Sequence, residues 1–132
     1  MTLFADTSAF IPLLVRSDDD HAAVRDAFRR AIEAGRRVIT TNYVVVETVA
    51  VLQNRIGLEP VRDFTTRVLP LVDVVFADAG LHERAMARLL RMDRRRVSLV
   101  DATSFEVMDT HGVADVLGLD SDFEGQGFRL VP

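Results

Sequence analysis

The chain has 132 residues, of which 48% are apolar and 27% are charged, and its formal net charge is −4. This composition is typical of one soluble globular domain and excludes a largely disordered chain. The absence of cysteine excludes disulfides and thiolate chemistry. All 16 basic residues are arginine, which excludes chemistry that needs a lysine, such as a Walker A nucleotide site or a Schiff base.

No stretch of the chain approaches the ~20 apolar residues of a membrane span. The first residues also lack the charged start and the long apolar segment of a signal peptide. We therefore expect a cytoplasmic protein that does not contact a membrane. The net negative charge is unusual for a protein that binds nucleic acid.

Short apolar runs alternate with helical patterns, which predicts βαβ units and a parallel sheet. In chain order, we expect a strand at 3–6, a helix from about residue 8 that Pro12 disturbs, a helix over 18–34, a strand at 37–41, helices over 43–56 and 60–71, a strand at 73–77, helices over 81–92 and 99–110, a strand within 113–119 and a strand at 128–131. The valine-rich start of the 43–56 segment also suits a strand, but the length of its apolar run favours a helix.

Two features of these elements can be specified further. The buried face of the 18–34 helix is predicted to consist of Ala22, Ala23, Ala27, Phe28 and Ala31. The helices over 43–52 and 61–71 carry more apolar surface than a small sheet covers, which favours a shared face in a dimer. We predict a single three-layer α/β/α domain over residues 1–132, with a central, mainly parallel five-stranded sheet.

Four acidic residues stand where such a sheet would gather them. Asp6 ends the first strand, Asp120 ends the fourth, and Asp101 lies in the first turn of the 99–110 helix. Glu47 is the lone charge in an apolar helix, where a charge is seldom buried unless it is paired or bound to metal. Ligand sites of parallel sheets lie at the carboxyl ends of the strands, so we expect these side chains to meet there.

Each acid also has an ordinary structural role open to it. Asp6 suits a helix cap, Asp101 completes a capping box with Ser98, and Asp120 suits a turn together with Asp122. Glu47 has the alternative of facing solvent at the edge of a helix that forms a dimer.

Clustered carboxylates need a compensating charge, because repulsion and burial would otherwise protonate some of them. A divalent cation supplies that charge, and a ligand set made only of oxygen selects hard ions such as Mg²⁺ or Mn²⁺. Such a site can ionise a water for attack on phosphorus and neutralise the charge of the leaving oxygen. The acidic cluster therefore indicates metal-dependent phosphoryl chemistry.

At these residues the chain resembles the PIN-domain ribonucleases, and among them the toxins of VapBC toxin–antitoxin systems. The matching segments are Phe-Ala-Asp-Thr-Ser-Ala at 4–9, Thr-Asn-Tyr-Val-Val-Val-Glu at 41–47, Ser-Leu-Val-Asp-Ala at 98–102 and Leu-Asp-Ser-Asp-Phe at 119–123. They stand in the family's order, and the resemblance covers essentially the whole chain.

The resemblance implies that Asp6, Glu47, Asp101 and Asp120 are the acidic quartet of a Mg²⁺-dependent endoribonuclease toxin, for which Mn²⁺ is a substitute ion. Asp6, Asp101 and Asp120 would bind metal, while Glu47 would orient the water or share a second metal. The expected reaction is hydrolysis of an RNA phosphodiester by metal-activated water, leaving 5′-phosphate and 3′-hydroxyl ends. The resemblance also implies a homodimer and a small cognate antitoxin whose tail enters the active-site groove.

Substrate contacts are expected at Thr7, Ser8, Asn42, Ser98, Asp122, Arg94, Arg95 and Arg96. Asn42 has the alternative of capping its helix. The arginine run at 94–96 has the alternatives of a solvated loop or a contact with the antitoxin, and it directly precedes the helix that carries Asp101. As phosphate contacts, these arginines would bind any RNA sequence with strong salt dependence.

The sequence departs from the family at one position. The family often has Thr or Ser two positions before the fourth acid, where this chain has Gly118. Ser121 is an alternative source of that hydroxyl, and Asp122 competes with Asp120 as the fourth acid. We favour Asp120 because it is predicted to end the strand directly.

Two other functions are weighed against this interpretation. A haloacid-dehalogenase-like phosphatase also has an Asp after the first strand, but it needs a second Asp where this chain has Ser8, and it normally uses a lysine. A catalytically silent PIN-like module would act only by binding RNA or protein. The complete acidic quartet argues against such a module.

Overall fold

Five parallel strands form the central sheet of the computed structural model, which describes residues 1–132. The strands are β1 (Leu3–Ala5), β2 (Val38–Thr41), β3 (Asp73–Val75), β4 (Asp115–Leu117) and β5 (Arg129–Val131), in the order β3-β2-β1-β4-β5. The chain builds outward from β1 to β2 and β3 on one side and to β4 and β5 on the other. Ligands of open parallel sheets bind beside such a reversal, at the carboxyl ends of the strands.

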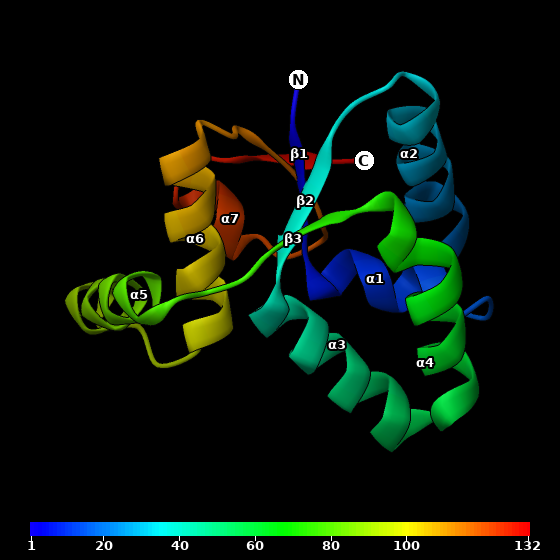
Figure 1. Ribbon diagram of the computed structural model, residues 1–132, viewed down its shortest axis with the longest axis horizontal. Helices are drawn as coiled ribbons and strands as arrows, with labels where there is room; N and C mark the ends of the chain where they lie inside the picture. Colours follow the sequence, from blue (N-terminus) through cyan, green and yellow to red (C-terminus); the bar gives the residue numbers. More distant parts are fainter.

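Helices cover both faces of the sheet. They are α1 (Thr7–Leu14), α2 (His21–Glu33), α3 (Asn42–Arg55), α4 (Leu58–Asp63), α5 (Ala79–Met92), α6 (Leu99–His111) and α7 (Asp122–Gly125), with a π-helical turn η1 (Phe64–Val68) and a 3₁₀ turn η2 (Leu69–Leu71) after α4. Figure 1 shows α5, α6 and α7 on one side of the sheet, and α2 and α4 on the other. The predicted α/β/α class is confirmed, and the sheet is entirely parallel. None of the helices combines the length and apolar character that crossing a membrane would need.

The second helix begins later than predicted. The backbone N–H of Asp20 donates to Asp18 Oδ1 at 2.8 Å, which fixes a turn, and α2 starts only at His21. Ala22 and Ala23 are consequently exposed, which contradicts the predicted core face. The buried residues of α2 are Val24, Ala27, Phe28 and Ala31.

The predicted helix over 60–71 is instead three short segments. It begins at Leu58, so Pro60 is not its first residue, and it widens into the π-helical turn at Phe64. Pro70 lies in the final 3₁₀ turn, where its ring does not have to fit inside a regular helix. Phe64 remains buried and packs on Phe10 with ring centroids 5.0 Å apart.

The fourth strand ends at Leu117. The prediction that Asp120 ends this strand directly is therefore wrong. Both neighbours of β4 leave the sheet at that level. Ala5 is the last residue of β1 before the turn into α1, and Val131 is the last residue of β5. Asp120 therefore lies in the loop after β4, and the unpredicted helix α7 follows it.

Phe123 anchors this loop in the core. Its ring centroid lies 5.0 Å from that of Phe105 on α6, and 6.4 Å from those of Phe4 on β1 and Phe128. Because Phe123 is fully buried, the segment that carries the neighbouring acids has a fixed position relative to β1 and α6.

One buried acid belongs to the opposite edge of the sheet. Asp115 begins β4 and bonds to Arg129 at 2.8 Å and to Arg36 at 3.1 Å. Hydrogen bonds from Arg129 and Arg36 hold the pKa of this carboxyl below its usual range. Asp115 therefore stabilises the fold and is separate from the acids at the carboxyl ends of the strands.

Candidate active site

A cavity of about 510 Å³ opens beyond the carboxyl ends of β1 and β4. Its wall comes from α1 and the loop after it, from α3, from the start of α6 and from the loop after β4. The lining residues are Asp6, Thr7, Ser8, Ile11, Pro12, Asp18, Glu47, Val51, Arg55, Arg96, Ser98, Asp101, Leu119 and Asp120. All four acids of the predicted quartet are among them, so the fold gathers these side chains as the sequence predicts.

Asp6 combines a structural role with an open ligand atom. It is the N-cap of α1, and its Oδ2 accepts hydrogen bonds from the backbone N–H and the hydroxyl of Ser8, at 3.1 and 2.7 Å. Its Oδ1 is buried without any hydrogen-bond partner, and the residue is 3% exposed. Burial raises the pKa of Asp6 to about 6; the charge of Glu47 adds to this rise, and the hydrogen bonds from Ser8 oppose it.

Asp101 is likewise both a helix cap and a site acid. The Ser98 hydroxyl accepts from the Asp101 backbone N–H at 3.0 Å, and Asp101 Oδ2 accepts from the Ser98 N–H at 3.2 Å. Burial raises the pKa of Asp101 to about 6, and the charges of Asp6 and Asp120 add to the rise. The capping box is therefore confirmed, and it holds Asp101 beside the other carboxylates.

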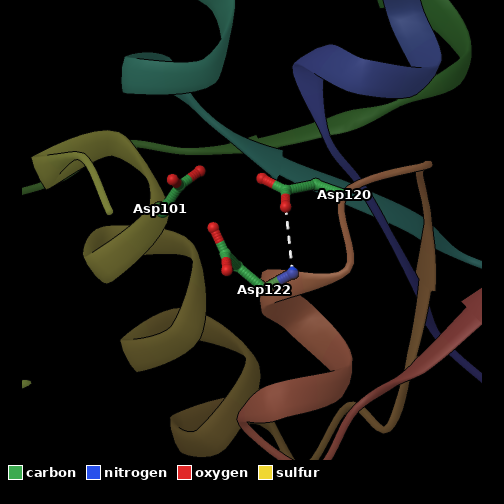
Figure 2. Close-up of side chains that lie close together, drawn as sticks. All are labelled: Asp101, Asp120 and Asp122. Atoms are coloured by element: carbon green, nitrogen blue, oxygen red, sulfur yellow. Dashed lines mark hydrogen bonds between the residues drawn. The ribbon is translucent and has the colours of Figure 1, made fainter. Parts of the chain in front are cut away.

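Figure 2 shows the carboxylates of Asp101, Asp120 and Asp122 pointing toward one another from α6, from the loop after β4 and from the start of α7. One oxygen of each lies within 4.8 Å of the others. Asp120 Oδ1 accepts from the Asp122 backbone N–H at 2.9 Å. Both residues that compete for the fourth acid therefore lie at the same cluster, although only Asp120 lines the cavity.

Glu47 reaches the cavity from the opposite wall. It is half-buried on α3, and Val51 and Arg55 follow it along the same wall at helical spacing. Its neighbour Val46 is 66% exposed. Glu47 thus lies at the acidic pocket together with the other three acids, and the alternative that it faces solvent away from them does not hold.

Ser8 occupies the space that Gly118 leaves. The Ser8 hydroxyl donates to Asp6 and accepts from the backbone N–H of Leu119 at 2.9 Å, which ties α1 to the loop after β4. A Cβ on Gly118 would lie 2.9 Å from Ser8 Oγ. A hydroxyl residue at 118 would collide with this arrangement, and the alternative hydroxyl of Ser121 is outside the cavity lining.

The bridge through Ser8 gives a test of the Gly118 position. Gly118→Ala is expected to displace the Ser8 hydroxyl and to lower the free energy of unfolding by about 1–3 kcal/mol, as overpacking usually does. Urea titration measures the change. In the double variant Gly118→Ala/Ser8→Ala the clash is gone, so stability should partly return. No recovery in the double variant would show that Ser8 is not the residue in conflict.

Some predicted substrate contacts lie elsewhere. Asn42 is outside the cavity lining, and its Oδ1 accepts from the Ala77 N–H at 2.8 Å. It does not cap α3 either, because Thr41 precedes it and accepts from the Val44 N–H at 3.1 Å. Thr7 and Ser98 do line the cavity. Of the arginine run at 94–96, only Arg96 lines it; the other two face a separate hollow beside the end of α5.

Two charged residues of the cavity lining, Arg55 and Asp18, are not among the predicted site residues. Arg55 lies eight positions after Glu47, a spacing that keeps both on one face of a helix, so the pattern could have identified it. Asp18 also lines the cavity, from the loop between α1 and α2. It was interpreted as part of a helix start, and no sequence signal distinguishes it from Asp19 and Asp20.

These residues fit a hard divalent cation. The donor set is made of carboxylate and hydroxyl oxygens, which Mg²⁺ and Mn²⁺ prefer. The orphaned Oδ1 of Asp6 lacks a partner that a buried carboxylate oxygen normally has. Burial is the main cause of the raised pKa values of Asp6 and Asp101, and repulsion between the site carboxylates adds to it; a bound cation would offset both costs of ionising these acids.

The sequence matches the PIN domain family over residues 3–128. The chain belongs to the PIN domain family. It is 34% identical to the 23S rRNA-specific endonuclease VapC20 of Mycobacterium tuberculosis over 127 residues. This alignment covers 96% of this chain and 95% of VapC20. The predicted resemblance to PIN-domain ribonucleases of the VapC type is confirmed.

Two solved structures are similar to this chain in fold. The crystal structure of Mycobacterium tuberculosis VapC20, a sarcin–ricin loop cleaving toxin, matches with a TM-score of 0.85 over 98% of this chain and 99% of that one. FitAcB from Neisseria gonorrhoeae matches with a TM-score of 0.71 over 98% and 96% of the two chains, at 13% identity. The second match supports the fold alone.

The raised pKa of Asp6 predicts how the stability of the metal-free PIN domain depends on pH. Its value of about 6 in the folded state exceeds the ordinary 3.8, so the folded state binds the proton more readily and is favoured as pH falls through 6. Protonation of Asp6 alone should raise the free energy of unfolding by roughly 1 kcal/mol as the pH falls from 7 to 5. Urea unfolding in EDTA measures this gain. The Asp6→Asn variant should show a smaller gain, and an unchanged gain would contradict the assignment.

Proposed function

We propose that this VapC-like PIN-domain endoribonuclease toxin hydrolyses RNA with a divalent ion, Mg²⁺ or its substitute Mn²⁺, held by Asp6, Asp101 and Asp120. The observation that carries the proposal is the buried, unpartnered Oδ1 of Asp6 in a cavity lined by three further acids. Asp6 and Asp101 are the principal ligands, and Asp120 completes the site directly or through water.

When bound, the ion would ionise a water for attack on phosphorus and neutralise charge on the leaving oxygen, giving 5′-phosphate and 3′-hydroxyl ends. The chain's own residues orient the reactants. Glu47 faces the three ligands from α3, so it orients the attacking water by accepting a hydrogen bond from it. No histidine lines the cavity, and the protein groups able to take a proton there are carboxylates.

RNA approaches this site through its phosphates. The four site carboxylates account for a charge equal to the whole net charge of −4, so the rest of the protein is neutral overall. Arg96 and Arg55 are the cations of the cavity wall, and both are exposed. A guanidinium group can donate two parallel hydrogen bonds to one phosphate. Arg96 and Arg55 are therefore suited to hold the RNA backbone on either side of the scissile bond. The hydroxyls of Thr7, Ser8 and Ser98 line the same space.

The partners follow from the family and from the surface. We propose a small cognate antitoxin whose tail enters the acidic cavity, a cytoplasmic location, and a homodimer. The dimer is supported by apolar side chains that stay exposed on the two segments predicted to share a face, namely Val46 on α3 and Leu71 at the end of η2, which are 66% and 49% exposed. Because VapC20 is specific for 23S rRNA, ribosomal RNA is the first substrate to test.

Cleavage and metal binding test the proposal together. Purified protein should cleave ribosomal RNA with Mg²⁺ or Mn²⁺ and not in EDTA, and calorimetric titration should show Mn²⁺ binding that Asp6→Asn removes. Binding of RNA without cleavage and without Mn²⁺ uptake would identify the silent PIN module instead.

The role of Glu47 predicts a separate effect. Glu47→Gln keeps the shape of the side chain but removes its charge, so cleavage should fall by about 10²-fold or more while the fold stays intact. The rate at saturating Mg²⁺ is measured beside Glu59→Gln, a change at an exposed glutamate of α4 outside the cavity. Full turnover by Glu47→Gln would return Glu47 to a surface role.

A further inference from the structure

Arg96 is tied to the acidic cluster by a single ion pair. It lies between α5 and α6, and its guanidinium donates to Asp122 Oδ1 at 3.0 Å. The Arg96 side chain is 70% exposed, whereas that of Asp122 is only 10% exposed. Arg96 also lines the cavity that contains the quartet. An exposed cation thus neutralises a nearly buried carboxylate at the rim of the site.

Asp122 also lies beside the carboxylates of the proposed metal site. One of its oxygens lies within 4.8 Å of oxygens from Asp101 and Asp120, and the unpartnered Asp6 Oδ1 belongs to the same cavity. A cation bound among these carboxylates would draw on the charge of Asp122 as well. Arg96 and the cation therefore compete for one carboxylate, by simple Coulomb attraction.

Arg96 likewise has a second partner available to it, an RNA phosphate. Its exposure places it where an RNA phosphate arrives, and a phosphate offers it charge-assisted hydrogen bonds like those of Asp122. Because the Arg96 side chain is so exposed, its ion pair with Asp122 is weak. Replacing Asp122 by a phosphate as the partner of Arg96 therefore costs little free energy.

We propose that Arg96 is shared between Asp122 and an RNA phosphate, and that this exchange couples RNA binding to metal binding. In the free protein Arg96 holds Asp122. RNA takes Arg96 away, and Asp122 then contributes its full charge to the metal site as an additional ligand. By linkage, RNA and metal each strengthen the binding of the other. Arg96 and Asp122 are positioning residues in this account, which rests on the proposed metal-dependent function.

The metal side of the exchange is tested without RNA. Calorimetric titration with Mn²⁺ is expected to show about two- to fivefold tighter binding to Arg96→Gln than to the wild-type protein, because a competing cation is gone. Asp122→Asn should bind Mn²⁺ more weakly. Arg94→Gln removes the same charge from the same run but outside the cavity, so its Mn²⁺ affinity should stay near that of the wild type.

The RNA side is tested without metal. In EDTA, fluorescence anisotropy of a labelled single-stranded RNA oligonucleotide should show about two- to fivefold tighter binding to Asp122→Asn, because Arg96 is released. The gain should disappear in Arg96→Gln/Asp122→Asn and persist in Arg94→Gln/Asp122→Asn. A residue that merely anchors α7 would not increase RNA affinity when its charge is removed.

Two results would overturn the coupling. One is a Mn²⁺ affinity of Arg96→Gln equal to that of the wild type. The other is a gain of RNA affinity that survives without Arg96, which would indicate general repulsion by Asp122. Urea unfolding of each variant identifies any loss of fold. Failure of the wild-type protein to bind Mn²⁺ at all would instead overturn the proposed function.

Discussion

The Asp101→Asn variant is expected to lose RNA cleavage by on the order of 10³-fold, while its fold remains intact. The amide keeps an oxygen that can accept from the Ser98 N–H, so the capping box of α6 survives. The lost charge removes a metal ligand and relieves repulsion from Asp6 and Asp120. Cleavage rates with Mg²⁺ measure the loss, and Asp6→Asn should behave in the same way.

Asp19→Asn is the matched control for this loss. Asp19 is exposed and lies outside the cavity, so its amide variant should cleave at the rate of the wild type. Unfolding of the metal-free proteins separates catalysis from folding, because the site variants should be at least as stable as the wild type at neutral pH. Cleavage that survives in both Asp6→Asn and Asp101→Asn would contradict the metal site.

The Phe123→Ala variant is expected to lose about 3–5 kcal/mol of free energy of unfolding. Phe123 is fully buried among Phe4, Phe105 and Phe128, and the truncation leaves a cavity between α6 and the sheet. The same residue fixes the loop that carries Asp120, so Mn²⁺ binding should weaken as well. Urea titration and calorimetry measure the two effects.

Phe76→Ala provides the comparison, because Phe76 is 74% exposed and should change stability far less. Phe123→Leu retains most of the buried volume and keeps the protein folded if the alanine variant unfolds. A loss below about 1 kcal/mol in Phe123→Ala would contradict the anchoring role. So would normal Mn²⁺ affinity in a folded Phe123→Leu protein whose stability has dropped.

The parts of the fold that the sequence predicts well are those with local signals. The apolar run from Tyr43 is too long for a strand and was correctly predicted as a helix, which is α3. Asp6 and Asp101 could be placed because a strand end and a capping box fix their positions within a few residues. The topology of a parallel sheet then brings both acids to one edge, and Glu47 meets them there because α3 starts at the same edge.

The parts that could not be predicted depend on contacts between distant segments. The end of β4 is set by β1 and β5 leaving the sheet, which placed Asp120 in a loop. Helix α7 has only four residues, too few for a periodic pattern. The pairing of Arg96 with Asp122 joins residues 26 positions apart, and it changes what the arginine run is expected to do. Because of this pairing, removal of Arg96 is expected to change the metal affinity of the site.

Mapping of RNA 5′ ends in cells tests the central claim most directly. RNA is sequenced from its 5′-phosphate ends after induction of the wild-type protein and of Asp6→Asn, with both proteins present at equal levels. Cleavage by the acidic site predicts new 5′-phosphate ends at a small number of positions, present only with the wild type. The same new ends in the Asp6→Asn cells, or new ends that carry a 5′-hydroxyl instead, would contradict metal-dependent hydrolysis at this site.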